Sequence, residues 1–457
     1  MLISNINFRE GENSMKFSKK LAIAAIPAVM AMSAPQNVNS KLLLMSQEGW
    51  EVSFDGAANA FYTHNAAGAF DDATDTNLEQ DSIQANSSFT REGDYGVNEE
   101  GEDSSNIQVG LLPNVWGMTL KAPTTGGLDM QARIGFYTHI QGGSTASAWN
   151  SNGLINNRET NFSVSGDFGT VLMGRTLRLY QQTAILNDQT LFGVGTFAGD
   201  SADTTLGRIG AGYLYANFGS QILWTTPGLG PIGLKVSINT PEEPDGDDTN
   251  FETSSPAVQF IADVSYDLGP LGTYVWFDGH YQYANFTTTG GNTYQDSNGR
   301  DNNGAASTSE RTAKDGVEVG GIGTGIKLNY ANLSFVGAGF FNSGMGMTLG
   351  YTGGFDNALN PINYGGYYAQ LNVDLGGGTN VGYSWGQNER YGNKQTRAER
   401  IALVAPVIAQ EHHNAMVWHN VNDNFRLIAE GGYTETRYFQ AGSADATTLS
   451  LGAFFFW

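Results

Sequence analysis

The chain has 457 residues, of which 60 are glycine and 12% are aromatic, and its formal net charge is −22. This charge excludes nucleic acid as a partner, because phosphate binding needs clustered lysine and arginine. The chain contains no cysteine, which excludes disulfides, thiolate catalysis and cysteine-based metal sites.

The first 40 residues predict a leader and a signal peptide that is removed. Residues 15–20 are rich in lysine and residues 21–32 are apolar, as in export signals. Cleavage is expected before Ala34 or, alternatively, nearer Ser40. Beyond this region no apolar run approaches the roughly 18 residues that a membrane helix needs. We therefore expect a short N-terminal extension at 41–49, and a single structural unit at 50–457.

From residue 50 onward, apolar and polar residues alternate in short segments. In one segment Met130, Ile134 and Phe136 share one parity, whereas Gln131 and Arg133 share the other. This alternation is typical of a strand between lipid and water. The final segment, 451–457, also alternates and ends on an aromatic residue. Such an end suits a closed barrel whose apolar face meets lipid.

The connections between these segments are alternately short and long. The short ones, such as 166–169 and 269–272, have the glycine and proline of tight turns. The hairpins predict about 16 strands with both chain ends on the short-turn side. The fold class is thus all-β, a transmembrane antiparallel up-and-down barrel. The long loops, expected outside, lie near 65–103, 142–155, 177–216, 241–255, 287–315, 343–362 and 390–411, with a shorter one near 439–444.

The third long loop differs from the others in its apolar content. It carries Leu191, Phe192, Val194 and Phe197, which would be unfavourable in water. A barrel of about 16 strands encloses more space than its side chains fill. We therefore expect residues 177–216 to fold into the lumen and form a constriction loop.

Two stretches resemble the trimeric general porins of Gram-negative bacteria. Segment 166–171 (GDFGTV), which leads to Gly174 and Arg175, resembles the fifth-strand region of that family. Segment 208–215 (RIGAGYLY) sits where the family's chain leaves its constriction loop. The resemblance implies an outer-membrane homotrimer of barrels with about 16 strands each, in which the third loop narrows the pore opposite a basic cluster. Trp457 stands where the family more often has phenylalanine.

In such a pore, loop acids facing wall bases set a transverse field that orients polar solutes. The candidate loop acids are Asp188, Asp200 and Asp203. The candidate basic residues are Lys121, Arg133, Arg175, Arg178, Arg208 and Lys235.

Several of these candidates carry an alternative interpretation. Strict alternation puts Arg175 on the lipid side, and it is retained because parity often ends where a loop begins. Lys327 and Arg426 have inward parity but lie on distant strands, and so rank lower. The bases could instead neutralise lumenal acids such as Asp263 and Glu430.

Acidic loops give a second candidate feature. Asp245, Asp247 and Asp248 supply oxygen ligands that suit Ca²⁺ or Mg²⁺, which could bridge to lipopolysaccharide phosphates. The alternative is a solvated outer surface that attracts cations toward the mouth. No other cofactor is expected. No activated nucleophile is recognisable, so an enzyme is not expected.

The sequence favours an outer-membrane channel for passive diffusion of ions and small hydrophilic solutes, with weak cation preference. Expected partners are membrane lipid, lipopolysaccharide and two further copies of the chain. One alternative is a channel specific for a sugar or small organic acid. For sugars, the inward parity of Tyr137, Tyr274 and Trp276 gives no obvious aromatic ladder. The other alternative is a structural or adhesive barrel with a sealed lumen.

Overall fold

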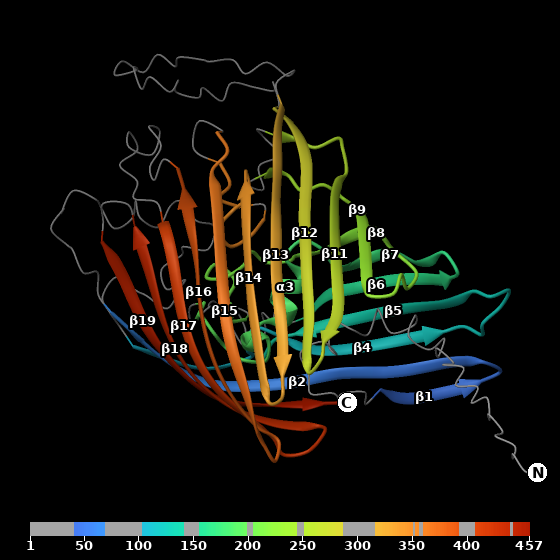
Figure 1. Cartoon of the computed structure of the whole chain (residues 1–457), viewed down its shortest axis with the longest axis horizontal. Helices are drawn as coiled ribbons and strands as arrows, with labels where there is room; N and C mark the ends of the chain where they lie inside the picture. The colour runs from blue at the N-terminus through green and yellow to red at the C-terminus, as the bar shows by residue number, and fades with distance from the viewer. Residues whose placement is uncertain are drawn as a thin grey trace, which may run out of the picture.

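The computed structural model describes residues 41–68, 103–140, 155–198, 204–244, 251–286, 316–350, 352–355, 360–392, 407–438 and 442–457. Within them, one antiparallel sheet of 19 strands closes into a barrel (Figure 1). None of the helices in this part of the chain is long and apolar enough to cross a membrane.

The first strands are β1 (Leu42–Gln47), β2 (Trp50–Ala67), β3 (Ser104–Gln108), β4 (Asn114–Lys121), β5 (Asp129–Thr138), β6 (Ile155–Gly166), β7 (Gly169–Leu177), β8 (Phe218–Thr225) and β9 (Ile232–Asn239). Between β7 and β8 lie the helix α3 (Gln182–Asn187) and the 3₁₀ helix η1 (Gln189–Phe192). The remaining strands are β10 (Phe251–Glu252), β11 (Ala257–Leu268), β12 (Leu271–Phe286), β13 (Gly316–Tyr330), β14 (Leu333–Ser343), β15 (Asn363–Gly376), β16 (Thr379–Tyr391), β17 (Val407–Asn420), β18 (Phe425–Tyr438) and β19 (Ser443–Phe456).

These strands fill 16 positions in the wall. Strands β3 and β4 both pair with β2 and share one position. Strands β10 and β11 both pair with β12 and share another. Strand β1 forms only a hairpin with β2. Pairing of β19 with β2 joins the two ends of the sheet, which confirms the predicted barrel.

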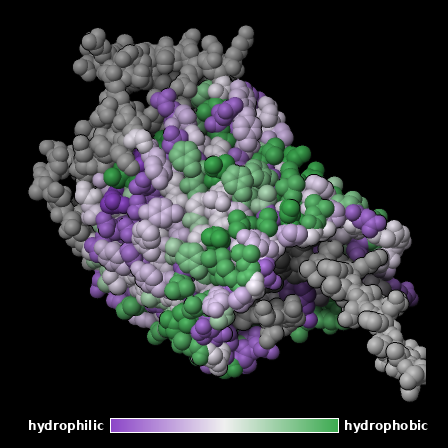
Figure 2. Space-filling model, viewed as in Figure 1, coloured by the Kyte–Doolittle hydropathy of each residue, from purple (hydrophilic) through white to green (hydrophobic). Residues whose placement is uncertain are grey.

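The alternation of side chains also follows the prediction. On β5 the side chains of Met130 and Phe136 are 36% and 38% exposed, whereas Tyr137 is 4% exposed. Because neighbouring residues of a strand point to opposite faces, the first two lie on the outside and Tyr137 faces the interior. Apolar residues spread over the middle of the visible outer wall (Figure 2). The outer surface therefore suits hydrocarbon.

The chain's two described ends meet along β2. Gly56 and Trp457 exchange backbone hydrogen bonds of 3.0 and 3.1 Å. Toward the start of β2, β1 pairs with the same side of β2 that β19 pairs with further along, and Leu42 lies opposite Phe54. The segment expected as a short extension thus forms a strand that continues the line of β19.

Strand β19 carries aromatic rings on both faces. Phe455 is exposed on the outside, whereas Phe454 and Phe456 are buried on the inside. The Phe454 ring lies 5.9 Å from Phe61 and 5.5 Å from Phe192, between ring centroids. The aromatic terminus therefore also provides an internal surface on which the third loop packs.

Replacing Phe454 by alanine is expected to lower the free energy of unfolding by about 3–5 kcal/mol, because it leaves a cavity among three other rings. Equilibrium unfolding in urea, with the barrel held in detergent micelles, measures this loss. Phe455→Ala is the matched control on the outer face and should cost clearly less. Equal losses for the two variants would contradict the assigned packing.

Candidate functional site

In the connection between β7 and β8, the described residues 178–198 and 204–217 lie inside the barrel. Its apolar residues Leu191, Phe192 and Val194 are buried and belong to one cluster with wall residues such as Phe61 and Phe454. The prediction that this third loop folds into the lumen is confirmed. Its apolar side chains pack against the inner wall, because they would otherwise be left in water.

Polar side chains of the wall bind the backbone at the start of the loop. Gln259 on β11 accepts hydrogen bonds from the backbone N–H groups of Leu179 and Tyr180, at 2.8 and 3.0 Å. Asp278 on β12 accepts one from the backbone N–H of Gln181 at 3.1 Å. These bonds satisfy buried backbone groups that have no partner in a helix or strand.

The middle of the loop is held in the same way from β13 and β15. Gln370 accepts from the backbone N–H of Gln189 at 2.9 Å and donates to the carbonyl of Asn187 at 2.7 Å. Lys327 donates to the side-chain oxygen of Asn187 at 3.2 Å. Lys327 thus contacts the loop, although its distant strand gave it a lower rank in the sequence.

A buried carboxylate holds the loop where it turns. Glu430 on β18 accepts from the backbone N–H groups of Val194 and Gly195 at 2.7 and 2.6 Å. Asn414 donates to the same carboxylate at 2.5 Å. A side chain at Gly193 would collide with this carboxylate, so glycine allows the close approach. None of these contacts is with a base of the wall. Glu430 instead holds the third loop in place through its backbone.

Arg426, the other base of lower rank, also meets the loop. Its guanidinium lies 5.3 Å from the ring centroid of Phe192 and 5.5 Å from that of Phe456. Its Nε donates to Asn420 at 2.8 Å. The arginine therefore lies against aromatic faces in a cation–π arrangement.

Asp188 and Arg208 form a buried pair within the loop. Arg208 Nε lies 3.8 Å from Asp188 Oδ1, and both side chains are fully buried. Burial lowers the pKa of Arg208, and the nearby Asp188 acts in the opposite direction. Burial raises the pKa of Tyr213, whose hydroxyl donates to Asp188 at 2.7 Å. The sequence suggested Asp188 as a loop acid and Arg208 as a base lining the constriction, whereas in the structure both are buried within one packed loop.

Residues 344–350 of the sixth long loop also enter the barrel, although the whole loop was expected outside. The backbone N–H of Tyr215 donates to the carbonyl of Thr348 at 3.0 Å. Asn388 on β16 donates to the carbonyl of Met347 at 2.9 Å. Met345 and Met347 are buried. Residues 344–350 therefore pack on the end of the third loop.

Arg133 projects inward from β5 and lies between two acids. Its guanidinium contacts Asp55 at 2.8 Å and Glu159 at 3.0 Å. A side chain at Gly117 would come within 2.5 Å of this guanidinium. Glycine thus leaves the space in which Arg133 lies along the wall. Arg133 therefore matches the alternative given from the sequence, in which a base on the wall neutralises acids of the lumen.

Water still reaches this cluster. The side chains of Arg133, Asp55 and Glu159 are 12%, 15% and 9% exposed. Elsewhere on the inner wall beside the loop, Ser384 and Asn414 are 0% and 1% exposed. The charged cluster is therefore the candidate constriction.

The other predicted wall bases lie elsewhere. Lys121 is half-exposed at the short-turn rim, with Nζ 4.0 Å from Glu51. Lys235 is on the inner face of β9, opposite Ile261. Arg175 pairs with Thr160 and shares the outer face with the exposed Met173. The prediction of Arg175 as a pore base is corrected, because the alternation of β7 continues as far as this residue.

Arg158 is a lumenal base that sequence reasoning missed. The register of β5 and β6 shifts at Gly135, which leaves Arg158 as an extra residue beside Glu159. Its guanidinium lies 5.1 Å from the ring centroid of Tyr137 and donates to the hydroxyl of Tyr215 at 3.4 Å. A bulge can re-aim one side chain, and no sequence signal marks this one.

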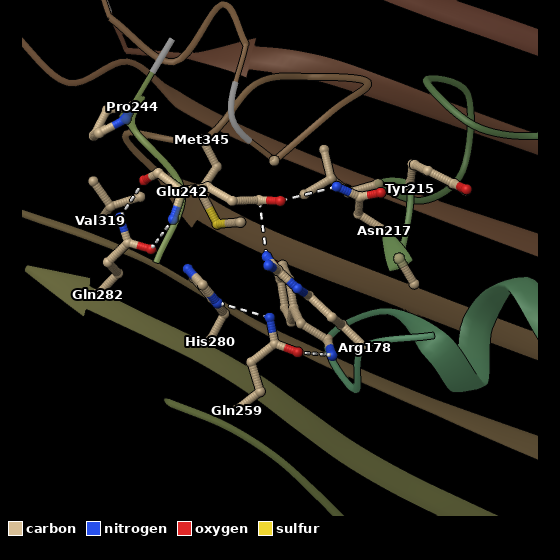
Figure 3. A pocket seen from close by; sticks show the side chains of 14 residues that line it. Arg178, Tyr215, Asn217, Glu242, Pro244, Gln259, His280, Gln282, Val319 and Met345 are labelled. Carbon is tan, nitrogen blue, oxygen red and sulfur yellow. Dashed lines mark hydrogen bonds and ion pairs between the residues drawn. The ribbon is translucent and has the colours of Figure 1, made fainter. Parts of the chain in front are cut away.

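Arg178 begins the third loop and is buried beside a recess in the barrel's interior (Figure 3). Its Nη1 lies 2.9 Å from Glu242 Oε2, and its Nη2 donates to the carbonyl of Thr240 at 3.1 Å. From the sequence, Arg178 was expected at the constriction, and no partner was predicted for it.

Five predicted acids lie outside the described residues: Asp200, Asp203, Asp245, Asp247 and Asp248. Within the described ranges, no group of three or more histidines and acids could hold a metal ion.

No protein-family model and no curated protein matches the chain. Solved structures do match, at low identity. The outer-membrane channel DcaP of Acinetobacter baumannii has a TM-score of 0.61 and 12% identity, covering 91% of this chain and 99% of that one. The anion-selective porin from Comamonas acidovorans has a TM-score of 0.55 and 14% identity, and the match covers 89% of this chain and 100% of that one. The trimer form of OmpT from Vibrio cholerae has a TM-score of 0.50 and 12% identity, and the match covers 90% of this chain and 100% of that one. The chain therefore has the fold of Gram-negative outer-membrane porins.

Proposed function

We propose that the chain is an outer-membrane channel for passive diffusion of ions and small hydrophilic solutes, and not an enzyme. The observation that carries the proposal is the Arg133 cluster, whose three charged side chains keep contact with water beside an inward loop. Charged groups at a narrow point act strongly on a passing solute, because little water screens them.

The proposed channel prefers cations weakly. The whole chain has a formal net charge of −22, which enriches cations near its mouth. At the cluster, Arg133 contacts both carboxylates and tempers their attraction for cations, so the preference is moderate.

The proposed partners follow from the surface. The apolar outer face suits lipid, and lipopolysaccharide would contact its outer part. A homotrimer is supported by the likeness in fold to OmpT in its trimer form. Binding of Ca²⁺ or Mg²⁺ at Asp245, Asp247 and Asp248 remains a proposal that rests on the sequence.

The refolded protein is expected to give stepwise conductance in a planar lipid bilayer. In a potassium chloride gradient, the reversal potential should have the sign of a weakly cation-selective pore. A clear anion preference would contradict the charge argument. Absence of any conductance steps would contradict the channel itself and favour the sealed structural or adhesive barrel.

A second candidate is a channel specific for small organic acids. Arg158 favours it, because no carboxylate among the described residues forms an ion pair with this guanidinium, which lies on the face of Tyr137. The similar porin from Comamonas acidovorans is anion-selective. Block of single-channel current by a small dicarboxylate, absent in Arg158→Gln, would favour this candidate. A sugar channel has less support, since Tyr137 and Trp276 are buried.

A further inference from the structure

One carboxylate joins the two ends of the third loop. Arg178 is the first residue of the loop and Asn217 is the last. Glu242, from the connection after β9, contacts Arg178 Nη1 at 2.9 Å through Oε2 and accepts from Asn217 Nδ2 at 2.9 Å through Oε1 (Figure 3). The backbone N–H of Arg178 also donates to the carbonyl of Asn217 at 2.9 Å.

The barrel wall fixes Glu242 in turn. Gln282 on β12 accepts from the backbone N–H of Glu242 at 3.1 Å and donates to its carbonyl at 2.5 Å. A rigid strand therefore positions the carboxylate that holds the loop's ends. The loop's base is tied to the wall even though the loop itself crosses the lumen.

The contacts around Glu242 do not form a binding site for a solute in the adjoining recess. Its empty volume is about 480 Å³, including the part open to solvent. However, its polar groups already bind one another: Gln259 holds the backbone of Leu179 and Tyr180 and contacts His280 at 2.9 Å. A solute would find few free donors or acceptors there. The contacts therefore serve the position of the chain.

The pair is also asymmetric in its exposure. The side chain of Arg178 is 7% exposed and that of Glu242 is 30% exposed. A buried guanidinium without a partner is costly and exerts its field over a long range, because little water screens it. Glu242 cancels that positive charge at the entrance to the constriction loop.

We infer that Glu242 is a positioning and selectivity-determining residue of the channel, which holds both ends of the third loop and cancels the charge of Arg178. This inference rests on the proposed channel function. Glu242 belongs to the fourth long loop, which follows β9. The inference therefore adds this residue to a constriction otherwise built from the third loop and the wall.

The first test compares Glu242→Gln with Glu252→Gln, which makes the same change of charge at an exposed position on β10. Glu242→Gln leaves Arg178 positive and should lower the potassium-to-chloride permeability ratio about twofold, because an unmatched cation attracts chloride. Glu252→Gln should leave the ratio near the wild-type value. Reversal potentials in planar bilayers measure both, and equal ratios in the two variants would overturn the inference.

A second set of variants separates charge from position. Arg178→Gln should raise the ratio, and the double variant Arg178→Gln/Glu242→Gln should return it toward wild type. Both should show larger open-channel current noise, since the ion pair that ties the base of the loop to Glu242 is lost. If Glu242→Gln fails to insert, Arg178→Gln still tests the pair, and an unchanged ratio with unchanged noise overturns the inference. A wild-type protein that does not conduct would instead contradict the proposed function.

Discussion

Replacing Glu430 by alanine is expected to raise single-channel conductance about two- to threefold, because the third loop loses its anchor and moves off the wall. The carboxylate accepts from the backbone N–H groups of Val194 and Gly195. Leaving each of these buried groups without a partner costs about 1–3 kcal/mol. To avoid that cost, the loop moves so that these two N–H groups bind water, and this movement widens the lumen. Conductance in a planar bilayer at fixed salt concentration measures the effect.

Two further variants test the reason for this increase. Glu435→Ala removes an acid from the outer face of the same strand, so conductance should stay at the wild-type value. Glu430→Gln keeps one acceptor oxygen for the loop and should give an intermediate conductance. If Glu430→Ala conducted like the wild type, the carboxylate would not hold the loop in place.

The barrel could be predicted because its physical requirement is periodic. Lipid on one side and the interior on the other impose a two-residue repeat, which Met130 and Tyr137 follow on β5. The inward third loop could be predicted for a related reason, since Leu191, Phe192 and Val194 need burial. Arg175 follows the same two-residue repeat. Its outward parity was visible in the sequence, and the prediction that it nevertheless lines the pore was wrong.

The partners of each charge could not be predicted from the sequence. A polar residue with inward parity can face water, a wall charge or the backbone of a loop, and the pattern is the same in each case. Gln259 and Gln370 thus look like pore-lining residues, yet they bind the third loop. Arg158 was missed because a bulge shifts parity at one residue.

The inner surface of β19 unites these observations. The terminal aromatic residues were attributed to lipid contact alone, but Phe454 and Phe456 pack against Phe192 of the loop. The same strand therefore closes the barrel, meets lipid and supports the constriction. The sequence shows the rings but not which of them face the lumen, because both faces are aromatic.

Replacing Arg133 by alanine is expected to make the channel strongly cation-selective. The change leaves Asp55 and Glu159 without the cation that contacts both of them. The potassium-to-chloride permeability ratio should rise about fivefold or more, since two unmatched carboxylates repel chloride. The free energy of unfolding should also fall by about 3–5 kcal/mol, the cost of removing one partner from a buried ion cluster. Reversal potentials and urea unfolding measure the two effects.

The control for Arg133 is Lys121, which lies half-exposed at the rim beside Glu51. Lys121→Ala removes the same charge from the wall, but water and salt screen that position, so selectivity should shift only slightly. Arg133→Lys keeps the charge and loses the forked contact with both acids, so it should restore most of the selectivity and less of the stability. Equal selectivity shifts for Arg133→Ala and Lys121→Ala would show that overall charge sets the preference. A shift confined to Arg133 would place the selecting point at its contact with Asp55 and Glu159.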